Sequence, residues 1–101
     1  MLDETSFRGA ILTAAGFNKA SGSRAVFSGA DLAGARLERA KFPGASLLKA
    51  NLMEASLLGA DLTSADLRGA NLHGADTWKT KLKGAQLELA VLTRTKLKGR
   101  G

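Results

Sequence analysis

The sequence predicts an all-β fold in which the chain turns a corner every five residues and winds around one apolar axis. Three observations predict it. Alanine recurs at positions divisible by five, leucine or phenylalanine follows two residues later, and this register does not shift anywhere along the 101 residues. Glycine is concentrated four residues after the alanine, as expected where a turn needs a positive φ angle.

The alanine and leucine positions form the predicted core. Between positions 5 and 95 only Thr5, Thr80 and Thr95 replace the alanine, and between 7 and 97 only Gly22 and Thr77 replace leucine or phenylalanine. In an α-helix, five residues would rotate each leucine by about 140° net, and in a flat strand an odd spacing would alternate its face. A chain that bends at every repeat instead points all of these leucines inward.

Some positions depart from the repeat. Gly22 leaves a gap in the core, which we expect either a bend or the Phe42 side chain of the next coil to fill. Because side chains disfavour positive φ angles, we expect corners without glycine to use another turn type. These corners carry Lys19, Arg39, Lys49, Glu54, Ser64, Lys79 and Arg94 at the glycine position.

The charged residues predict four sides per coil. A four-sided coil stacks residue i on residue i+20, a three-sided coil stacks it on residue i+15, and opposite charges in neighbouring coils attract. The spacing of fifteen gives six pairs of like charge and three of opposite charge. The spacing of twenty gives one like pair and five opposite pairs: Glu4 with Arg24, Lys41 with Asp61, Asp61 with Lys81, Arg68 with Glu88, and Asp76 with Lys96.

The string Ala-Asp/Asn-Leu followed by two variable residues, present at 50–54, 60–64 and 70–74, resembles the pentapeptide-repeat family. The resemblance covers about residues 2 to 99. It implies a right-handed quadrilateral β-helix, a solenoid of about five coils with four repeats each. We therefore expect residues 1–101 to form a single domain, either complete or a module of a longer protein.

The two ends of the predicted β-helix raise a separate question. Members of the family commonly carry capping helices or flanking segments, and none is evident here. An uncovered β-helix end exposes backbone groups and apolar core, which favour further stacking. We therefore expect end-to-end pairing into a homo-oligomer, or continuation into a longer chain, or charge repulsion at the basic C-terminal coil that blocks stacking.

Composition limits the classes of function. The chain has no cysteine, no signal-like N-terminus and no apolar stretch of membrane-spanning length, so we expect a cytoplasmic protein, and the resemblance implies a bacterial one. Residues 1–78 contain eight basic and eight acidic residues, so the net charge of +6 lies in residues 79–101. That segment contains Glu88 and seven basic residues, namely Lys79, Lys81, Lys83, Arg94, Lys96, Lys98 and Arg100.

No residue pattern predicts catalysis, a cofactor or a metal site. His73 occupies an outward position, and Ser64, His73 and Asp61 lie on separate corners with no reason to converge. Aspartates and asparagines before the leucine are expected to bind nearby backbone, as short polar side chains do in turns. Asp31, Asn51 and Asn71, spaced by twenty, predict a structural hydrogen-bond ladder. We expect no enzyme.

The outward side chains predict a protein-binding site. Large apolar residues are rare outside the core, and Trp78 lies above Leu58 at the twenty-residue spacing. A tryptophan flanked by basic residues is typical of a binding anchor, and local packing of the indole is the alternative. The predicted function is a non-catalytic scaffold for a protein partner with an acidic or mixed surface. Its predicted partner-binding residues are Leu58, Trp78, Lys79, Arg94, Lys96 and Lys98.

Two other functions remain open. The basic C-terminal end could attract nucleic acid through its phosphates, but the repeat has no helix for a groove and too few aromatic residues for a stacking platform. Nucleic acid is therefore less favoured. The resemblance implies the other alternative, because some family members imitate duplex DNA and protect DNA gyrase from inhibitors. Those members are strongly acidic and this chain is neutral to basic, so gyrase protection would need another surface.

Overall fold

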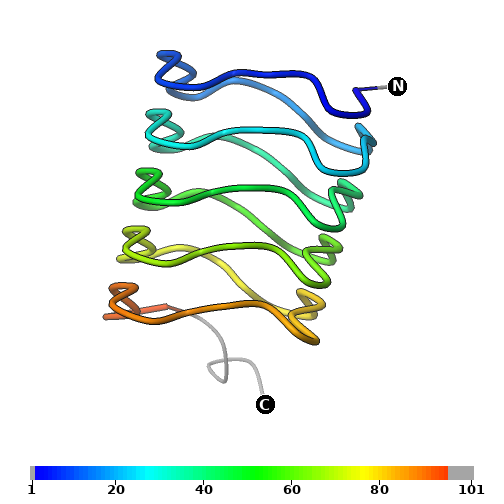
Figure 1. Cartoon of the computed structure of the whole chain (residues 1–101). Helices are drawn as coiled ribbons and strands as arrows, with labels where there is room; N and C mark the ends of the chain where they lie inside the picture. Colours follow the sequence, from blue (N-terminus) through cyan, green and yellow to red (C-terminus); the bar gives the residue numbers. More distant parts are fainter. Residues whose placement is uncertain (1, 96–101) are drawn as a thin grey trace.

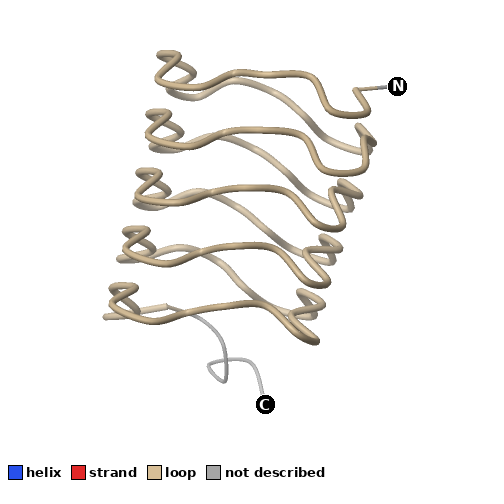
Figure 2. Cartoon of the chain, in the orientation of Figure 1, coloured by secondary structure: helices blue, strands red, loops and turns tan. Residues whose placement is uncertain are grey.

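The computed structural model describes residues 2 to 95, which wind into a four-sided solenoid (Figure 1). Fourteen parallel bridges, from Ser6 with Val26 to Asn71 with Val91, all join residue i to residue i+20. One coil therefore contains twenty residues, and the four-sided prediction is confirmed. Residues 2 to 95 contain no helix and no extended strand, because each side contributes one isolated bridge residue between two corners (Figure 2).

Five positions describe every repeat. In order they are the inner alanine, the bridge residue, the inner leucine, the first corner residue and the second corner residue. In residues 60–64 these are Ala60, Asp61, Leu62, Thr63 and Ser64. The inner residues point to the axis and the other three point outward.

Backbone hydrogen bonds hold neighbouring coils together. In the repeat 60–64, the N–H groups of the inner leucine and the second corner residue donate to the next coil, at 2.9 Å and 2.8 Å. The bridge N–H donates to the preceding coil at 2.8 Å, and the N–H of Ala65 closes the corner on the Leu62 carbonyl at 3.0 Å. Among the described residues, the N–H of the first corner position has no backbone acceptor.

This unpaired N–H explains the preference for aspartate or asparagine at the bridge position. Their side-chain oxygens accept the first-corner N–H two residues later, at 3.0 to 3.2 Å. The expected turn hydrogen bonds are therefore confirmed, and the ladder has its first rung where Asn51 Nδ2 donates to Asp31 Oδ1 at 3.2 Å. Pro43 lies at a first corner, where its missing N–H has no consequence. The six accepting residues are Asp31, Asn51, Asp61, Asp66, Asn71 and Asp76.

The prediction of different turn types was wrong. Every second corner residue from Glu4 to Arg94 has a positive φ, between 55° and 73°, whether or not it is glycine. A positive φ costs a residue with a side chain about 1–2 kcal/mol. The hydrogen bonds to the coils above and below impose one corner geometry on the whole stack, so residues with side chains adopt the glycine conformation.

The interior is a continuous column of buried alanines and leucines from Ala25 to Ala75. Near the N-terminus it also contains four phenylalanines, Phe7, Phe17, Phe27 and Phe42, with ring centroids 5.0 to 6.3 Å apart. Phe42 does not fill the space at Gly22 as one expectation had it. The Leu2 main chain lies there, because a Cβ on Gly22 would be 2.5 Å from the Leu2 carbonyl carbon.

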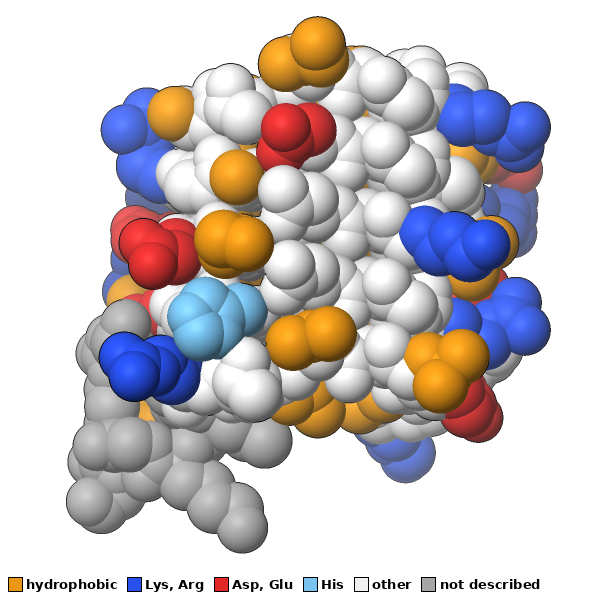
Figure 3. Space-filling model, turned by 90° about the vertical axis from the view of Figure 1, so that its left-hand side faces the viewer, with side chains coloured by type: hydrophobic (Ala, Val, Ile, Leu, Met, Phe, Trp, Pro, Cys, Tyr) orange, Lys and Arg blue, Asp and Glu red, His pale blue; other side chains and the backbone are white. Residues whose placement is uncertain are grey.

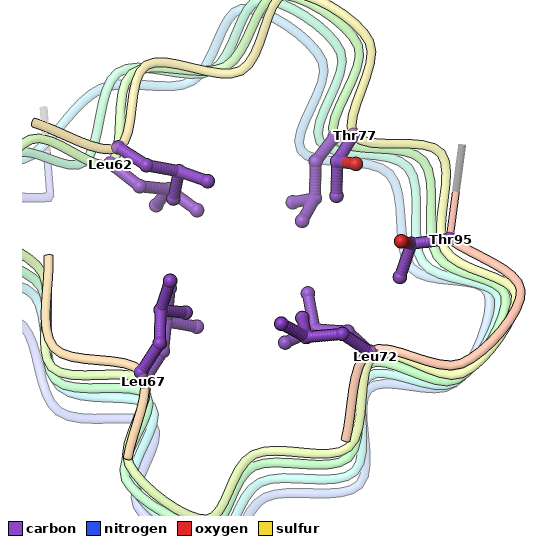
Figure 4. A pocket seen from close by; sticks show the side chains of 9 residues that line it. Leu62, Leu67, Leu72, Thr77 and Thr95 are labelled. Atoms are coloured by element: carbon purple, nitrogen blue, oxygen red, sulfur yellow. The ribbon is translucent and has the colours of Figure 1, made fainter. Parts of the chain in front are cut away.

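Near the C-terminal end the interior is less filled. Leu62, Leu67 and Leu72 point inward from three sides and Thr77 from the fourth, around a cavity of about 30 Å³ (Figure 4). Thr77 is only 4% exposed, and its hydroxyl has no hydrogen-bond partner among the described residues. The Thr80 hydroxyl, by contrast, donates to the Leu57 carbonyl at 2.7 Å.

Candidate interaction surface

Stacking at twenty-residue intervals arranges the outward side chains in columns along four corners. We name two of these corners after their largest apolar side chains. The tryptophan corner consists of Asn18, Lys19, Glu38, Arg39, Leu58, Gly59, Trp78 and Lys79. The leucine corner consists of Arg8, Gly9, Ser28, Gly29, Leu48, Lys49, Arg68, Gly69, Glu88 and Leu89.

Charge is distributed unequally among the corners. The tryptophan corner and the leucine corner each contain three basic residues and one acidic residue. The corner at Asp3, Glu4, Arg24 and Lys83 has two of each sign, and the corner with Glu54 and Arg94 has one of each. Half a coil separates the tryptophan corner from the leucine corner, so the two basic corners lie diagonally opposite each other.

The tryptophan corner brings Leu58 and Trp78 together in adjacent coils. The N–H of Arg39 donates to the Leu58 carbonyl at 2.8 Å, and the N–H of Gly59 donates to the Trp78 carbonyl at 3.0 Å. The Arg39 side chain lies against Gly59, since a Cβ on Gly59 would be 3.4 Å from Arg39 Cγ. The result is an apolar pair beside two basic side chains.

The structure brings some of the predicted partner-binding residues together and separates others. Leu58, Trp78 and Lys79 share the tryptophan corner, where Lys79 is exposed, while Leu58 and Trp78 are partly buried and so less exposed than expected. Arg94 lies on another corner, in the column above Glu54. Lys96 and Lys98 lie outside the described residues, so the expected cover of the indole by Lys98 stays a prediction.

His73 belongs to the face shown in Figure 3, where its pale blue side chain lies beside a central stripe of backbone and uncharged, non-hydrophobic side chains, drawn white. Its Nδ1 is 2.6 Å from the Thr93 hydroxyl, in the same column. Asp61 accepts hydrogen bonds from the N–H and hydroxyl of Thr63 at a different side of the coil. Ser64, His73 and Asp61 therefore lie apart, in three different columns.

Two aspartates at bridge positions have altered acidity. The pKa of Asp61 lies below its ordinary value of 3.8, chiefly because Thr63 donates its hydroxyl and N–H to the carboxylate, with further help from the charges of Lys81 and Lys41. The pKa of Asp66 is lowered chiefly by hydrogen bonds from Arg68, whose guanidinium binds both carboxylate oxygens at 2.9 and 2.7 Å. Both shifts are explained by local structural contacts.

Within residues 2–95, no group of three or more histidine, cysteine, aspartate or glutamate side chains is arranged to hold a metal ion. In the same range, no helix has the length and apolar character needed to cross a membrane.

Sequence reasoning missed several surface residues. Arg39 and Glu38 belong to the tryptophan corner, and the spacing of twenty from Gly59 and Leu58 would have identified them. It also missed Leu89, which is 90% exposed at a second corner position. The signal for Leu89 was a large apolar residue at a position where glycine is common.

Comparison with known proteins gives the following likenesses. The family model for pentapeptide repeats matches residues 23–57 and 49–76, together just over half of the chain. A pentapeptide repeat protein from the thylakoid lumen of Arabidopsis thaliana is 28% identical, with a TM-score of 0.73 over 97% of this chain and 61% of its own. HetL, a pentapeptide repeat protein involved in heterocyst differentiation regulation in the cyanobacterium Nostoc, is 31% identical, with a TM-score of 0.68 over 93% of this chain and 49% of its own.

This chain thus spans about three fifths and half of the lengths of those two proteins. QnrB1, a plasmid-mediated fluoroquinolone resistance protein, matches at 23% identity with a TM-score of 0.45 over 89% of this chain and 56% of its own, too low a likeness to bear on function. No curated protein matches the sequence.

Proposed function

Because the chain belongs to the pentapeptide repeat family, we propose that it is a non-catalytic scaffold, a right-handed rod of about five coils, that binds a protein partner at the tryptophan corner. The observation that carries this proposal is the pairing of Leu58 and Trp78 beside Arg39 and Lys79. Tryptophan and arginine are enriched among residues that dominate binding energy at protein interfaces. The cytoplasmic and bacterial setting expected from the sequence belongs to the same proposal.

The charges around the apolar pair indicate the kind of partner. Lys19, Arg39 and Lys79 share the corner with only Glu38, and Lys81 lies two residues beyond Lys79. Basic side chains around an apolar pair favour a partner that presents acidic residues around an apolar one, because complementary charge speeds association and suppresses wrong partners.

The test is affinity capture with immobilised wild type and Trp78→Ala, followed by calorimetry with each purified protein that the wild type retains. We expect Trp78→Ala to keep the β-type circular dichroism spectrum and to lose at least tenfold in affinity. Met53→Ala, which truncates an exposed side chain on another corner, is the matched control and should bind as the wild type does. Equal affinity of the wild type and Trp78→Ala for every retained protein would refute the tryptophan corner.

Salt dependence separates this function from nucleic-acid binding. Phosphate contacts by lysine and arginine weaken steeply as salt rises, whereas an apolar anchor is less sensitive. We expect no binding of duplex or single-stranded DNA at physiological salt. Tight DNA binding under those conditions, with a steep salt slope and no effect of Trp78→Ala, would favour the nucleic-acid alternative instead.

A further inference from the structure

The leucine corner contains a surface hollow that the proposed function does not use. Leu48, Lys49, Arg68, Gly69 and Leu89 line it, and its volume is about 370 Å³. That size is within the range of pockets that hold small ligands or single side chains of a partner. Basic, hydrophobic and some acidic side chains lie at the right-hand edge of the face in Figure 3.

Gly69 is one of the residues that line the hollow. It lies in the same column as Lys49 and Leu89, one coil from each. A Cβ on Gly69 would lie 3.2 Å from Lys49 Cγ, so a side chain at this position would press against Lys49, another lining residue. Leu48 and Leu89 supply the apolar part of the lining.

Leu89 is unfavourable for the isolated fold in two respects. Its side chain is 90% exposed, and its φ of 63° lies in the left-handed region that disfavours residues with a Cβ. Glycine, which eight other corners use, would avoid both costs. Ten other corner residues with side chains share this φ, so what distinguishes Leu89 is the exposure of a large apolar side chain.

The charges at the hollow define what would fit it. Arg68 is bound to Asp66 by two hydrogen bonds. These bonds and the charge of Asp66 raise the pKa of Arg68, with a smaller contribution from the charge of Glu88. Lys49 is exposed and has no salt bridge among residues 2–95. Its ammonium group is thus the cation available to a ligand, next to two apolar walls.

We propose that the leucine corner binds a short acidic peptide segment of a partner protein. A leucine-sized apolar side chain of that segment occupies the hollow between Leu48 and Leu89, and a neighbouring carboxylate binds Lys49. Because the tryptophan corner is diagonally opposite, this site is separate from it and does not depend on it.

The probe is a fluorescein-labelled peptide with one leucine between two aspartates, measured by fluorescence anisotropy against the full chain. Two control peptides replace the leucine by serine or both aspartates by lysine. We expect each control peptide to bind at least fivefold more weakly. Equal binding of the three peptides, or no binding of the probe, would overturn the proposal.

Leu89→Gly is the decisive variant, because it removes one wall of the hollow and relieves the backbone strain. We expect affinity for the probe to fall at least tenfold while the melting temperature rises, which excludes unfolding as the cause. Gly69→Lys fills the hollow and adds positive charge, so a loss of binding there shows that shape is required as well as charge. Gly34→Lys, on another corner where a Cβ meets nothing within 4 Å, is the matched control and should bind normally.

The location of the bound probe peptide on the protein gives an independent test. Backbone amide shifts on titration of the probe should centre on residues 48, 49, 68, 69 and 89, and Trp78→Ala should not change the affinity. Shifts centred on Leu58 and Trp78 would overturn this site and support the tryptophan corner, so failure of one proposal is distinguishable from failure of the other.

Discussion

The two ends of the solenoid share one backbone but are packed in different ways. At the N-terminal end, four phenylalanine rings contact one another and the Leu2 main chain occupies the space at Gly22. At the C-terminal end, leucines and Thr77 surround a cavity of about 30 Å³. Corner geometry and the spacing of twenty are the same at both ends. The backbone ladder therefore accommodates different core side chains and a small cavity, and these differences in packing should appear in stability.

The largest expected effect is the loss of a buried aromatic ring. Phe27 is 1% exposed and contacts the rings of Phe7, Phe17 and Phe42. We expect Phe27→Ala to lower the free energy of unfolding by about 3–5 kcal/mol, through lost burial and the cavity left behind. Urea titration followed by circular dichroism measures this change.

Leu67→Ala is the matched variant at the other end. Leu67 lies in the same column, is also buried, and already lines the C-terminal cavity. We expect it to cost about 2–3 kcal/mol, at the low end for leucine, because fewer contacts are lost beside an existing cavity. A cost equal to that of Phe27→Ala would show that the two ends are packed equally well.

A smaller effect is expected from the buried hydroxyl of Thr77. Thr77→Val should raise the free energy of unfolding by about 1 kcal/mol, because a buried polar group without a partner destabilises the fold. Thr80→Val is the control and should lower it by about 1 kcal/mol, because that hydroxyl donates to the Leu57 carbonyl. Thermal melting distinguishes the two signs. If Thr77→Val were destabilising, the cavity would hold a water molecule bound by the hydroxyl, since about 30 Å³ is enough for one.

Corner variants test what the two ends have in common. Ala14 and Leu89 have φ angles of 57° and 63° near opposite ends. We expect Ala14→Gly and Leu89→Gly each to stabilise the fold by about 0.5–1 kcal/mol, because glycine removes the left-handed strain but adds entropy to the unfolded chain. Gly34→Ala should have the opposite sign. Gains that differ strongly between the two ends would contradict a single corner geometry.

The smallest expected effect is a loss of stability in the C-terminal half of the solenoid at low pH. The pKa values of Asp61 and Asp66 are lowered in the folded state, so their stabilisation is present above about the ordinary value of 3.8 and is lost as pH falls through the folded values. We expect the protection of the backbone amides against hydrogen exchange, relative to the intrinsic exchange rate at each pH, to fall below this pH at Lys81 and Gln86, the bridge partners of the two aspartates. Asp61→Asn keeps a turn acceptor without a charge and should remove the response at Lys81. Protection factors that do not depend on pH in this range would contradict the role of these carboxylates.

Much of the fold could be predicted from the residues alone. The period of five excluded a helix and a flat strand, and charge pairs such as Glu4 with Arg24, which form a salt bridge, indicated the spacing of twenty. The role of aspartate and asparagine before the leucine was also predictable, because it is a contact between residues two apart. Each of these features depends on short or strictly periodic distances, which a linear sequence displays directly.

The candidate surfaces were less predictable. Leu58 and Trp78 were paired correctly by the spacing of twenty, but Arg94 was grouped with them on charge alone and lies on another corner. Leu89 was missed although a leucine at a glycine position is visible in the sequence, because its 90% exposure and its place beside Leu48 in the lining of the hollow are known only from the structure. Charge balance along the chain does not show which residues share a corner.

By itself, the sequence determined the repeat, the inward positions and the number of sides, because all three follow from periodicity. Only the tertiary structure decided that every corner has the same positive φ, that Leu2 occupies the space at Gly22, and that Thr77 borders a cavity. The physical reason is that these features depend on contacts between stacked coils. Hydrogen bonds to the neighbouring coils override the local preference of each corner residue, and packing volume depends on residues twenty positions away.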